Sequence, residues 1–512
     1  MPSRHPRSSS RIGVVALAVL SAVASPGGSQ TIQIKTLPIA EGDQWRFFPS
    51  ANTGMAGVSI ALRDSLLDPF VNPALGSRVS ASSHGSFFGS PTFYSLSRNA
   101  GGGQTFPIGG LLRKGSTFGG LAVALQEIDE INSGFTPAFP PNVRAVDGTV
   151  LVPDTPSRQN RYAFATLGRV FESAKLSVGG SLMWSGLRNV DGVDLLYSGA
   201  AGINQHGSTF DARLGMLKEF RGNQTVEAIF LHNRFGMTHD VTWLDQVWDP
   251  NTRTFAQLAR VDHNRDKTNT WGLHIAYSRP LADSGWRIGG IVTSNLMSHP
   301  KLPDYQITQV MVIPWDPGHS AAYNFGIGIS KSHRATTFGI DAIFEPIHSH
   351  TWGEAHGPLQ TASGGTIPDG GKTTENHFRF ANAVMRAGVG HDLLIHPDQK
   401  LRLQFGIALR SIDYSLDQYD HVTERPRQQD ESWIEWTKTW GLGLHFSDLE
   451  IRYSGRRATG TGRPGIFAEQ DFRVAAADAL SGSNFISAPN GPISLTGVSV
   501  TTHQLSVSLP IR

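Results

Sequence analysis

From about Ser116 to its end, the chain is a series of segments in which apolar and polar residues alternate. Because successive side chains of a β-strand point to opposite faces, a repeat of two residues predicts a strand with one apolar face. In the clearest case, Leu401, Leu403, Phe405, Ile407 and Leu409 are interleaved with Arg402, Gln404, Gly406, Ala408 and Arg410. The same alternation recurs in segments that begin at Leu176, Trp271, Phe338, Trp436, Leu449 and Leu505. The pattern predicts an all-β protein.

The connections between these segments are alternately very short and long. Short turns are predicted at 172–174, 221–223, 282–285, 333–335, 394–399 and 447–448, and long connections at 130–158, 189–204, 241–266, 300–318, 351–372, 417–429 and 456–497. Hairpins need few residues at one end of a sheet and tolerate insertions at the other end, where loops carry function. These connections predict an antiparallel meander of about 14 strands, to which one hairpin near the start would add two.

Residues 1–24 have the features of a secretory signal peptide. Basic residues at Arg4, Arg7 and Arg11 precede an apolar run at 12–23, and small residues at Ala22 and Ala24 suit a cleavage site. We therefore expect an exported protein. The chain contains no cysteine, which excludes disulfides and thiolate chemistry.

Strand length and aromatic positions favour a membrane barrel over a secreted β-sandwich or propeller. Several alternating segments span roughly 10–14 residues, as tilted membrane strands do, whereas strands of soluble proteins cluster near 5–6. Tryptophans lie near segment ends, where an interfacial girdle is expected, and no blade-length repeat recurs. The net charge of +2 does not favour a nucleic-acid partner. The sequence predicts a transmembrane antiparallel β-barrel in the bacterial outer membrane, in contact with its lipid.

A different segment precedes the predicted barrel. Small residues, among them Gly54 and Gly57, dominate residues 42–76, so that the backbone can pack closely. Asn72 and Pro73 mark a turn at its end, followed by Ala74. We expect residues 25–77 to form an N-terminal extension and a compact plug, called the hatch below, and residues 78–512 to form the barrel.

The Gly-x-Ala-Gly run at 54–57, followed by Asn72-Pro73-Ala74 and a first strand, resembles the FadL-type outer-membrane family of long-chain fatty-acid and aromatic-hydrocarbon transporters and related type IX secretion barrels. The resemblance implies a barrel with an N-terminal hatch in its lumen, Asn72, Pro73 and Ala74 as the hatch motif, and Gly54 and Gly57 in the hatch core. It also implies uptake or passage of hydrophobic small molecules. The alternative within the same fold is a scaffold or shuttle barrel whose partners are secretion-system proteins.

Charged residues at inward positions are interpreted as lumen lining rather than as substrate-reading groups. They are Arg402, Arg410, Glu450 and Arg452. The Pro- and Phe-rich loop at 135–143 is a candidate capture groove for an apolar solute.

No catalytic residue, cofactor site or metal site is assigned. Residues 460–465 match a dinucleotide fingerprint literally, but no folded unit follows, so that we interpret them as a loop. His348, His350, Glu354 and His356 share one parity, and we interpret them as solvated residues. A loop-borne hydrolase is disfavoured because no Ser/His/Asp set is recognisable, and we expect a protein that is not an enzyme.

Overall fold

The structure is a computed structural model that describes residues 50–62, 70–78, 84–97, 102–129, 144–145, 159–190, 202–249, 254–282, 284–299, 318–355, 357–396, 398–463 and 496–511. The predicted signal peptide, the candidate capture groove at 135–143 and His356 lie outside these residues.

The described residues are almost entirely β-strand. The strands are β1 (Gly85–Gly89), β2 (Thr92–Leu96), β3 (Gly102–Lys114), β4 (Thr117–Asp129), β5 (Arg144–Ala145), β6 (Gln159–Phe171), β7 (Leu176–Leu187), β8 (Gly202–Glu219), β9 (Thr225–Asp249), β10 (Thr254–Leu281), β11 (Trp286–His299), β12 (Gly318–His333), β13 (Thr336–Glu354), β14 (Leu359–Gln360), β15 (Thr366–Ile367), β16 (Lys372–His396), β17 (Gln399–Asp420), β18 (Arg425–His445), β19 (Glu450–Arg463) and β20 (Thr496–Ile511). Three short 3-10 helices are η1 (Thr53–Met55), η3 (Pro73–Arg78) and η4 (Glu172–Ala174). Among the described residues, no helix is long and apolar enough to cross a bilayer.

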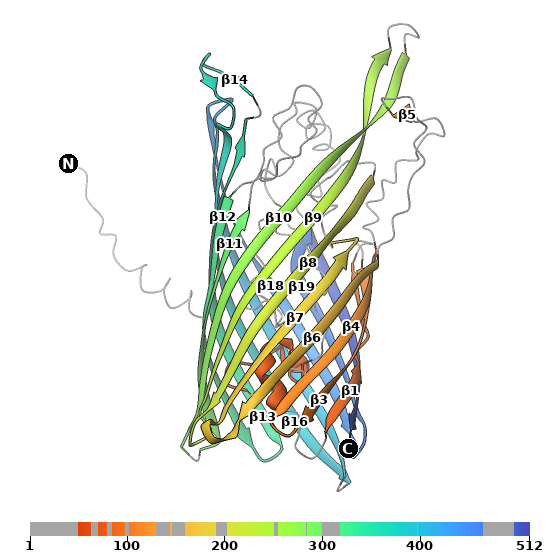
Figure 1. Cartoon of the computed structure of the whole chain (residues 1–512), viewed down its shortest axis with the longest axis vertical. Helices are drawn as coiled ribbons and strands as arrows, with labels where there is room; N and C mark the ends of the chain where they lie inside the picture. The colour runs from red at the N-terminus through yellow and green to blue at the C-terminus, as the bar shows by residue number, and fades with distance from the viewer. Residues whose placement is uncertain are drawn as a thin grey trace, which may run out of the picture.

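The long strands form one closed antiparallel barrel (Figure 1). β1 and β2 each pair with both β3 and β20, so that together they occupy one position in the wall and close it. The barrel has 16 strands. This confirms the predicted fold class, and the hairpin near the start accounts for the difference from about 14. The two additional strands are the position shared by β1 and β2 and its partner β3, both of which precede Ser116, where the predicted series of strands begins. The first of them is divided into two pieces of five residues each.

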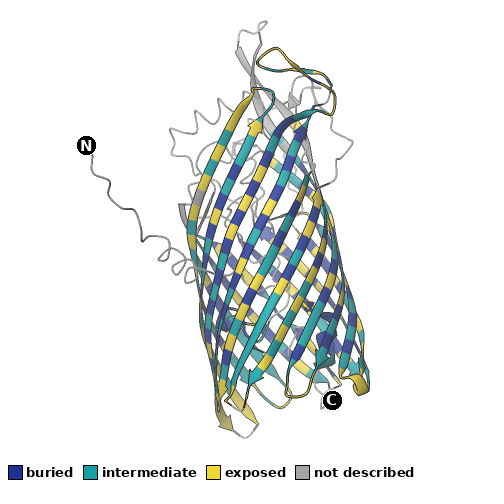
Figure 2. Ribbon diagram, turned by 90° about the vertical axis from the view of Figure 1, so that its left-hand side faces the viewer, coloured by how far each residue is buried: buried dark blue, intermediate teal, exposed yellow. Residues whose placement is uncertain are grey.

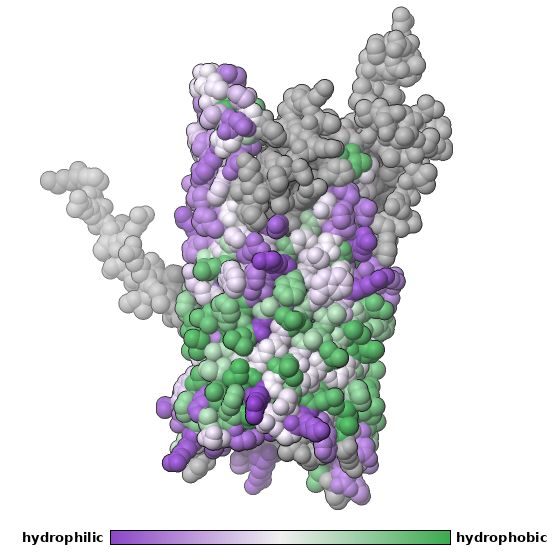
Figure 3. All heavy atoms as spheres, in the orientation of Figure 1, coloured by the Kyte–Doolittle hydropathy of each residue, from purple (hydrophilic) through white to green (hydrophobic). Residues whose placement is uncertain are grey.

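The outer surface of the wall is apolar in a broad band. Burial alternates along the strands, with the buried positions on the inner face (Figure 2). Leu121, Leu167 and Ile327 point outward and are 70%, 67% and 70% exposed, respectively. Figure 3 shows hydrophobic residues around the middle of the wall, with hydrophilic residues beyond them at both ends. Exposing such a continuous apolar surface to water is unfavourable, whereas contact with lipid acyl chains is not.

Two predicted long connections are instead continuations of strands. β9 and β10 stay paired from Thr225 and Ser278 as far as Asp249 and Thr254, through most of the predicted loop at 241–266. β17 and β18 likewise stay paired up to Asp420 and Arg425. Residues 460–463, interpreted from the sequence as loop, belong to β19. The apolar alternation ends where the wall leaves lipid, but backbone pairing continues into water, so that polarity marks the membrane boundary and not the strand end.

Two described segments of the hatch lie inside the lower half of the barrel (Figure 1). Residues 50–62, with η1, contact β16, β17, β18 and β19. Residues 70–78, with η3, contact the wall from β3 to β8. The two segments are therefore held by different parts of the wall.

Candidate functional site: the lumen and its hatch

The first hatch segment is held by polar side chains from neighbouring wall strands. Thr439 on β18 donates its hydroxyl to the Gly54 carbonyl and accepts from the Ala56 amide, both at 2.9 Å. Gln404 on β17 donates to the Ala51 carbonyl at 2.8 Å. Each bond satisfies a backbone group of a short irregular segment that cannot satisfy it internally, which is the usual requirement for burying such backbone.

Charged residues on β13 and β16 complete this attachment. Asp341 accepts the Ser59 amide at 2.7 Å and the Ile60 amide at 3.3 Å through the same carboxylate oxygen. Arg386, directly opposite Asp341 in the strand pair, donates to the Gly57 carbonyl at 2.9 Å. Asp341 and Arg386 are almost fully buried. The two opposite charges thus hold the backbone of Gly57, Ser59 and Ile60 in the hatch.

Glycines in the wall make room for this segment. A Cβ added at Gly406 would lie 2.4 Å from the Ala56 amide nitrogen, and one added at Gly388 would lie 2.4 Å from the Met55 carbonyl oxygen. Any side chain at these two positions would push the hatch away from the wall.

The predicted hatch motif is anchored on the opposite side of the lumen. Asn72 is fully buried; its Oδ1 accepts the Ala74 amide at 3.1 Å, and its Nδ2 donates to the Met216 carbonyl at 3.3 Å and to Glu227 Oε2 at 3.1 Å. A Cβ at Gly215 would lie 2.1 Å from Asn72 Oδ1. Asn72 therefore makes both a local turn contact and a contact to the wall.

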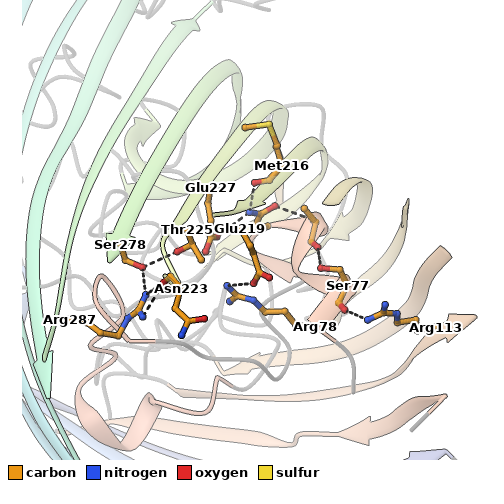
Figure 4. A network of polar contacts seen from close by, with 12 residues as sticks. Ser77, Arg78, Arg113, Met216, Glu219, Asn223, Thr225, Glu227, Ser278 and Arg287 are labelled. Carbon is orange, nitrogen blue, oxygen red and sulfur yellow. Dashed lines mark hydrogen bonds and ion pairs between the residues drawn. The ribbon is translucent and has the colours of Figure 1, made fainter. Parts of the chain in front are cut away.

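Further polar contacts surround the motif (Figure 4). Ser77 donates its hydroxyl to the Ala74 carbonyl at 2.8 Å, and its own carbonyl accepts from Arg113 on β3 at 2.5 Å. Arg78 lies 3.9 Å from Glu219 on β8. The second hatch segment thus contacts the wall at β3 on one side and at β8 on the other.

The four residues predicted to line the lumen lie at different depths. Arg410 is 5% exposed on the inner face of β17, with Nη2 3.6 Å from Glu345 Oε2. Arg402 pairs with Asp392 at 2.6 Å and lines a cavity beside the hatch. Arg452 pairs with Glu450 at 2.9 Å and lines a second cavity with Gly54 and Arg402.

Asp341, Glu345 and Arg386 are not among the site residues predicted from the sequence. Asp341 and Glu345 sit between the outward residues of the alternating segment that begins at Phe338, so that parity alone assigns them to the inner face. Nothing in the sequence pairs them with Arg386 and Arg410, because those residues belong to strands about 40 to 70 positions further along the chain, and only the register brings them together.

Toward the long-loop end, the inner face changes from charged to apolar. One buried cluster on β11, β12, β13, β16 and β17 consists of Met297, Ala322, Ile347, Phe378, Phe380, Ile412, Tyr414 and Leu416, and Trp433 packs against it. Ile347 and Ile412 share strand and parity with Glu345 and Arg410, two residues further from the hatch. The lumen wall therefore has a polar seat for the hatch and an apolar region beyond it.

On the outer face of the wall, the structure brings together histidines and a glutamate that are not predicted from the sequence to be neighbours. The nitrogens of His350 and His377 and a carboxylate oxygen of Glu375 all lie within 4.8 Å of one another. His348 and Glu354, which share the parity of His350, are not part of this group among the described residues.

No protein-family model and no curated protein sequence matches the chain. Several solved structures share its overall shape. A Pseudomonas aeruginosa FadL homologue is 10% identical over 91% of this chain and 99% of that one, with a TM-score of 0.41. The Pseudomonas putida toluene transporter TodX is 10% identical over 90% and 96%, with a TM-score of 0.36. CdiB from Acinetobacter baumannii is 10% identical over 83% and 60%, with a TM-score of 0.36. Values this low do not assign the chain to any of these proteins.

The class of the protein follows from its own wall. A closed antiparallel barrel satisfies every backbone group of its strands within the membrane, and its exposed apolar band faces lipid. The chain is a large β-barrel of the bacterial outer membrane.

Proposed function

We propose that this barrel passes hydrophobic small molecules, such as long-chain fatty acids or aromatic hydrocarbons, across the outer membrane. The apolar cluster on the inner face of the wall carries the proposal. A water-filled pore for polar solutes is lined by polar side chains, whereas here Phe378, Phe380 and Ile412 are turned to the lumen side. Each Å² of apolar solute surface removed from water against such a wall stabilises the solute by about 25 cal/mol.

In this proposal residues 25–77 are the N-terminal extension and hatch, and residues 78–512 form the transmembrane barrel. The described hatch segments lie deeper in the barrel than the apolar cluster, so that a solute reaches the cluster first and then needs the hatch to move. Polar contacts suit a reversible closure, because water can replace each hydrogen bond once the hatch is displaced. The protein is not proposed to make or break covalent bonds in its cargo.

Uptake of a labelled fatty acid or alkylbenzene into a deletion strain tests the proposal. The strain is complemented with the wild type, with Ile412→Asn or with Asp413→Asn. Ile412 is buried in the apolar cluster, while the neighbouring Asp413 is exposed on the outer face, so that the two substitutions alter opposite faces of one strand. We expect uptake to fall in the deletion strain and with Ile412→Asn, and to be restored by Asp413→Asn.

Unchanged uptake in the deletion strain, together with accumulation of unsecreted cargo protein, would refute transport and favour the secretion-barrel alternative. Equal uptake with Ile412→Asn and Asp413→Asn would show that the apolar cluster is not on the route. Heat-modifiable migration of each variant on a gel confirms that the barrel has folded.

A further inference from the structure

Four neighbouring strands carry a row of metal-binding residue types on the outer face. His319 on β12 is directly opposite His350 on β13, His350 is opposite His377 on β16, and His377 is opposite Asp417 on β17. Residues directly opposite each other in an antiparallel pair have Cβ atoms about 5 Å apart, so that their side chains can reach a common ligand. The register of the barrel, not the sequence spacing, produces this row.

Glu375 joins the two central histidines. His350 Nε2 lies 2.7 Å from Glu375 Oε1, and His377 Nε2 lies 3.8 Å from the same oxygen. The rings of His350 and His377 are stacked, with centroids 4.3 Å apart and an interplanar angle of 6°. His421 Nε2 lies 3.6 Å from the other oxygen, Glu375 Oε2. Three donor atoms, from His350, Glu375 and His377, therefore surround one position, and His421 approaches it from the side of Glu375 Oε2.

Two imidazoles and one carboxylate are a common ligand set for divalent transition metals, with metal–ligand bonds of about 2.0–2.2 Å. We propose that His350, Glu375 and His377 bind such an ion, with His421 placed to supply a fourth donor. Small rotations of side chains on rigid strands are enough to bring the donors to bonding distance. The remaining coordination positions face solvent and can take water or an anionic group from outside.

Neighbouring charges act on Glu375, the carboxylate at the centre of the cluster. Burial acts to raise the pKa of Glu375, but hydrogen bonds from Lys372 and His350 outweigh it and lower that pKa to about 2. Partial burial lowers the pKa of His350 below its ordinary value. The ammonium group of Lys372 occupies part of the position and competes with the ion.

The proposed site lies beyond the lipid band and outside the lumen. On β13 the last exposed large hydrophobic residue is Phe344, and Trp352 beyond it is half-buried against the His350 ring. On β16 the outward residues between the band and the cluster include Arg379. The cluster is thus at the level where the wall leaves the membrane on the long-loop side. A bound ion would be reached from outside the cell without passing the hatch.

Zn²⁺ binding to the full-length barrel in detergent tests the site, measured by competition with a chromophoric chelator after treatment with EDTA. We expect one tight equivalent for the wild type, with affinity at least about 10-fold lower in His350→Ala, His377→Ala and Glu375→Gln. His348→Ala is the matched control, because this exposed residue is two positions from His350 on the same face. Lys372→Met is expected to raise the affinity, since it removes the competing charge.

Cu²⁺ electron paramagnetic resonance gives an independent readout, because two histidine ligands produce nitrogen hyperfine structure that His377→Ala reduces. Equal Zn²⁺ affinity in the wild type, His350→Ala and His377→Ala would overturn the proposal, as would the absence of tight binding to the wild type. Unchanged affinity in Glu375→Gln would contradict the ligand role of the Glu375 carboxylate. Heat-modifiable migration identifies any variant that has not folded.

Discussion

Asp341 is expected to hold the first hatch segment in place, and its replacement by alanine should release that segment. The substitution removes the acceptor of the Ser59 and Ile60 amides and leaves the buried guanidinium of Arg386 without the opposite charge of Asp341. The wall strand itself keeps its backbone pairing, so that the change acts on the hatch and not on the barrel.

The magnitude follows from these contacts. A hydrogen bond to a charged group contributes about 1.5–3 kcal/mol, and the bond to Ser59, at 2.7 Å, is the stronger of the two. Removing one partner of a buried charge pair costs about 3–5 kcal/mol. This figure and that of the hydrogen bonds both include the lost Asp341 carboxylate, so that the two are not added. We take about 3 kcal/mol as the loss, which corresponds to a roughly 100-fold larger population of the released hatch. Asp341→Asn keeps one acceptor oxygen and should give a smaller increase.

A single introduced cysteine can report this population, because the chain has none of its own. Val58 is fully buried in the hatch, next to Gly339, and Val58→Cys is a change to a smaller side chain. A maleimide reacts with this thiol only when the segment opens, so that the labelling rate follows the open population. We expect labelling about 100-fold faster with Asp341→Ala than without it. Asp413→Ala, on the outer face of β17, serves as the control.

Labelling rates within about threefold of each other, in barrels that still show heat-modifiable migration, would refute this reasoning. The contacts of Asp341 would then contribute no more than about 0.6 kcal/mol to hatch closure. Fast labelling of Val58→Cys in the otherwise unchanged protein would show instead that the segment is open from the start.

Three further predictions concern the second hatch segment and the lipid band. Asn72→Ala removes the contacts to Ala74, Met216 and Glu227, and we expect it to lower the free energy of hatch closure by about 2 kcal/mol. Labelling of Leu75→Cys should then be about 30-fold faster. An unchanged rate would show that Asn72 does not anchor the motif. Gly215→Val should accelerate the same labelling about 10-fold, because its Cβ overlaps Asn72 and Pro73. Gly180→Val should not, because a Cβ at Gly180 would lie 3.7 Å from its nearest neighbour, the Arg213 carbonyl oxygen, and equal rates for the two variants would contradict the close fit. Val123→Arg, at an outward position that is 53% exposed, should lower the free energy of unfolding in lipid vesicles by about 2–4 kcal/mol, as measured by denaturant titration. Glu127→Arg, toward the long-loop end of the same strand, should change it by about 1 kcal/mol or less. Equal effects would show that the band does not face lipid.

The charged residues that hold the hatch, Asp341 and Arg386, could be predicted from the sequence only in part. Parity places Asp341 on the face opposite Phe344, and the Asn-Pro turn marks the end of the hatch. The attachment of the hatch to the wall could not be predicted, because Gly57 and Arg386 are 329 residues apart in the chain. The same holds for Asn72 and Glu227, at a separation of 155 residues.

The amino-acid sequence by itself determined which side of each strand faces lipid, because the two-residue repeat of a strand is a local property. It also determined most of the short turns, where the alternation is interrupted for a few residues. Only the tertiary structure decided the number of strands, the length to which β9, β10, β17 and β18 extend into water, and the residues that meet across the barrel. The physical reason is that closure and register depend on backbone pairing along the whole wall. One step of register would place His350 opposite a different residue of β16 and would separate Asp341 from Arg386.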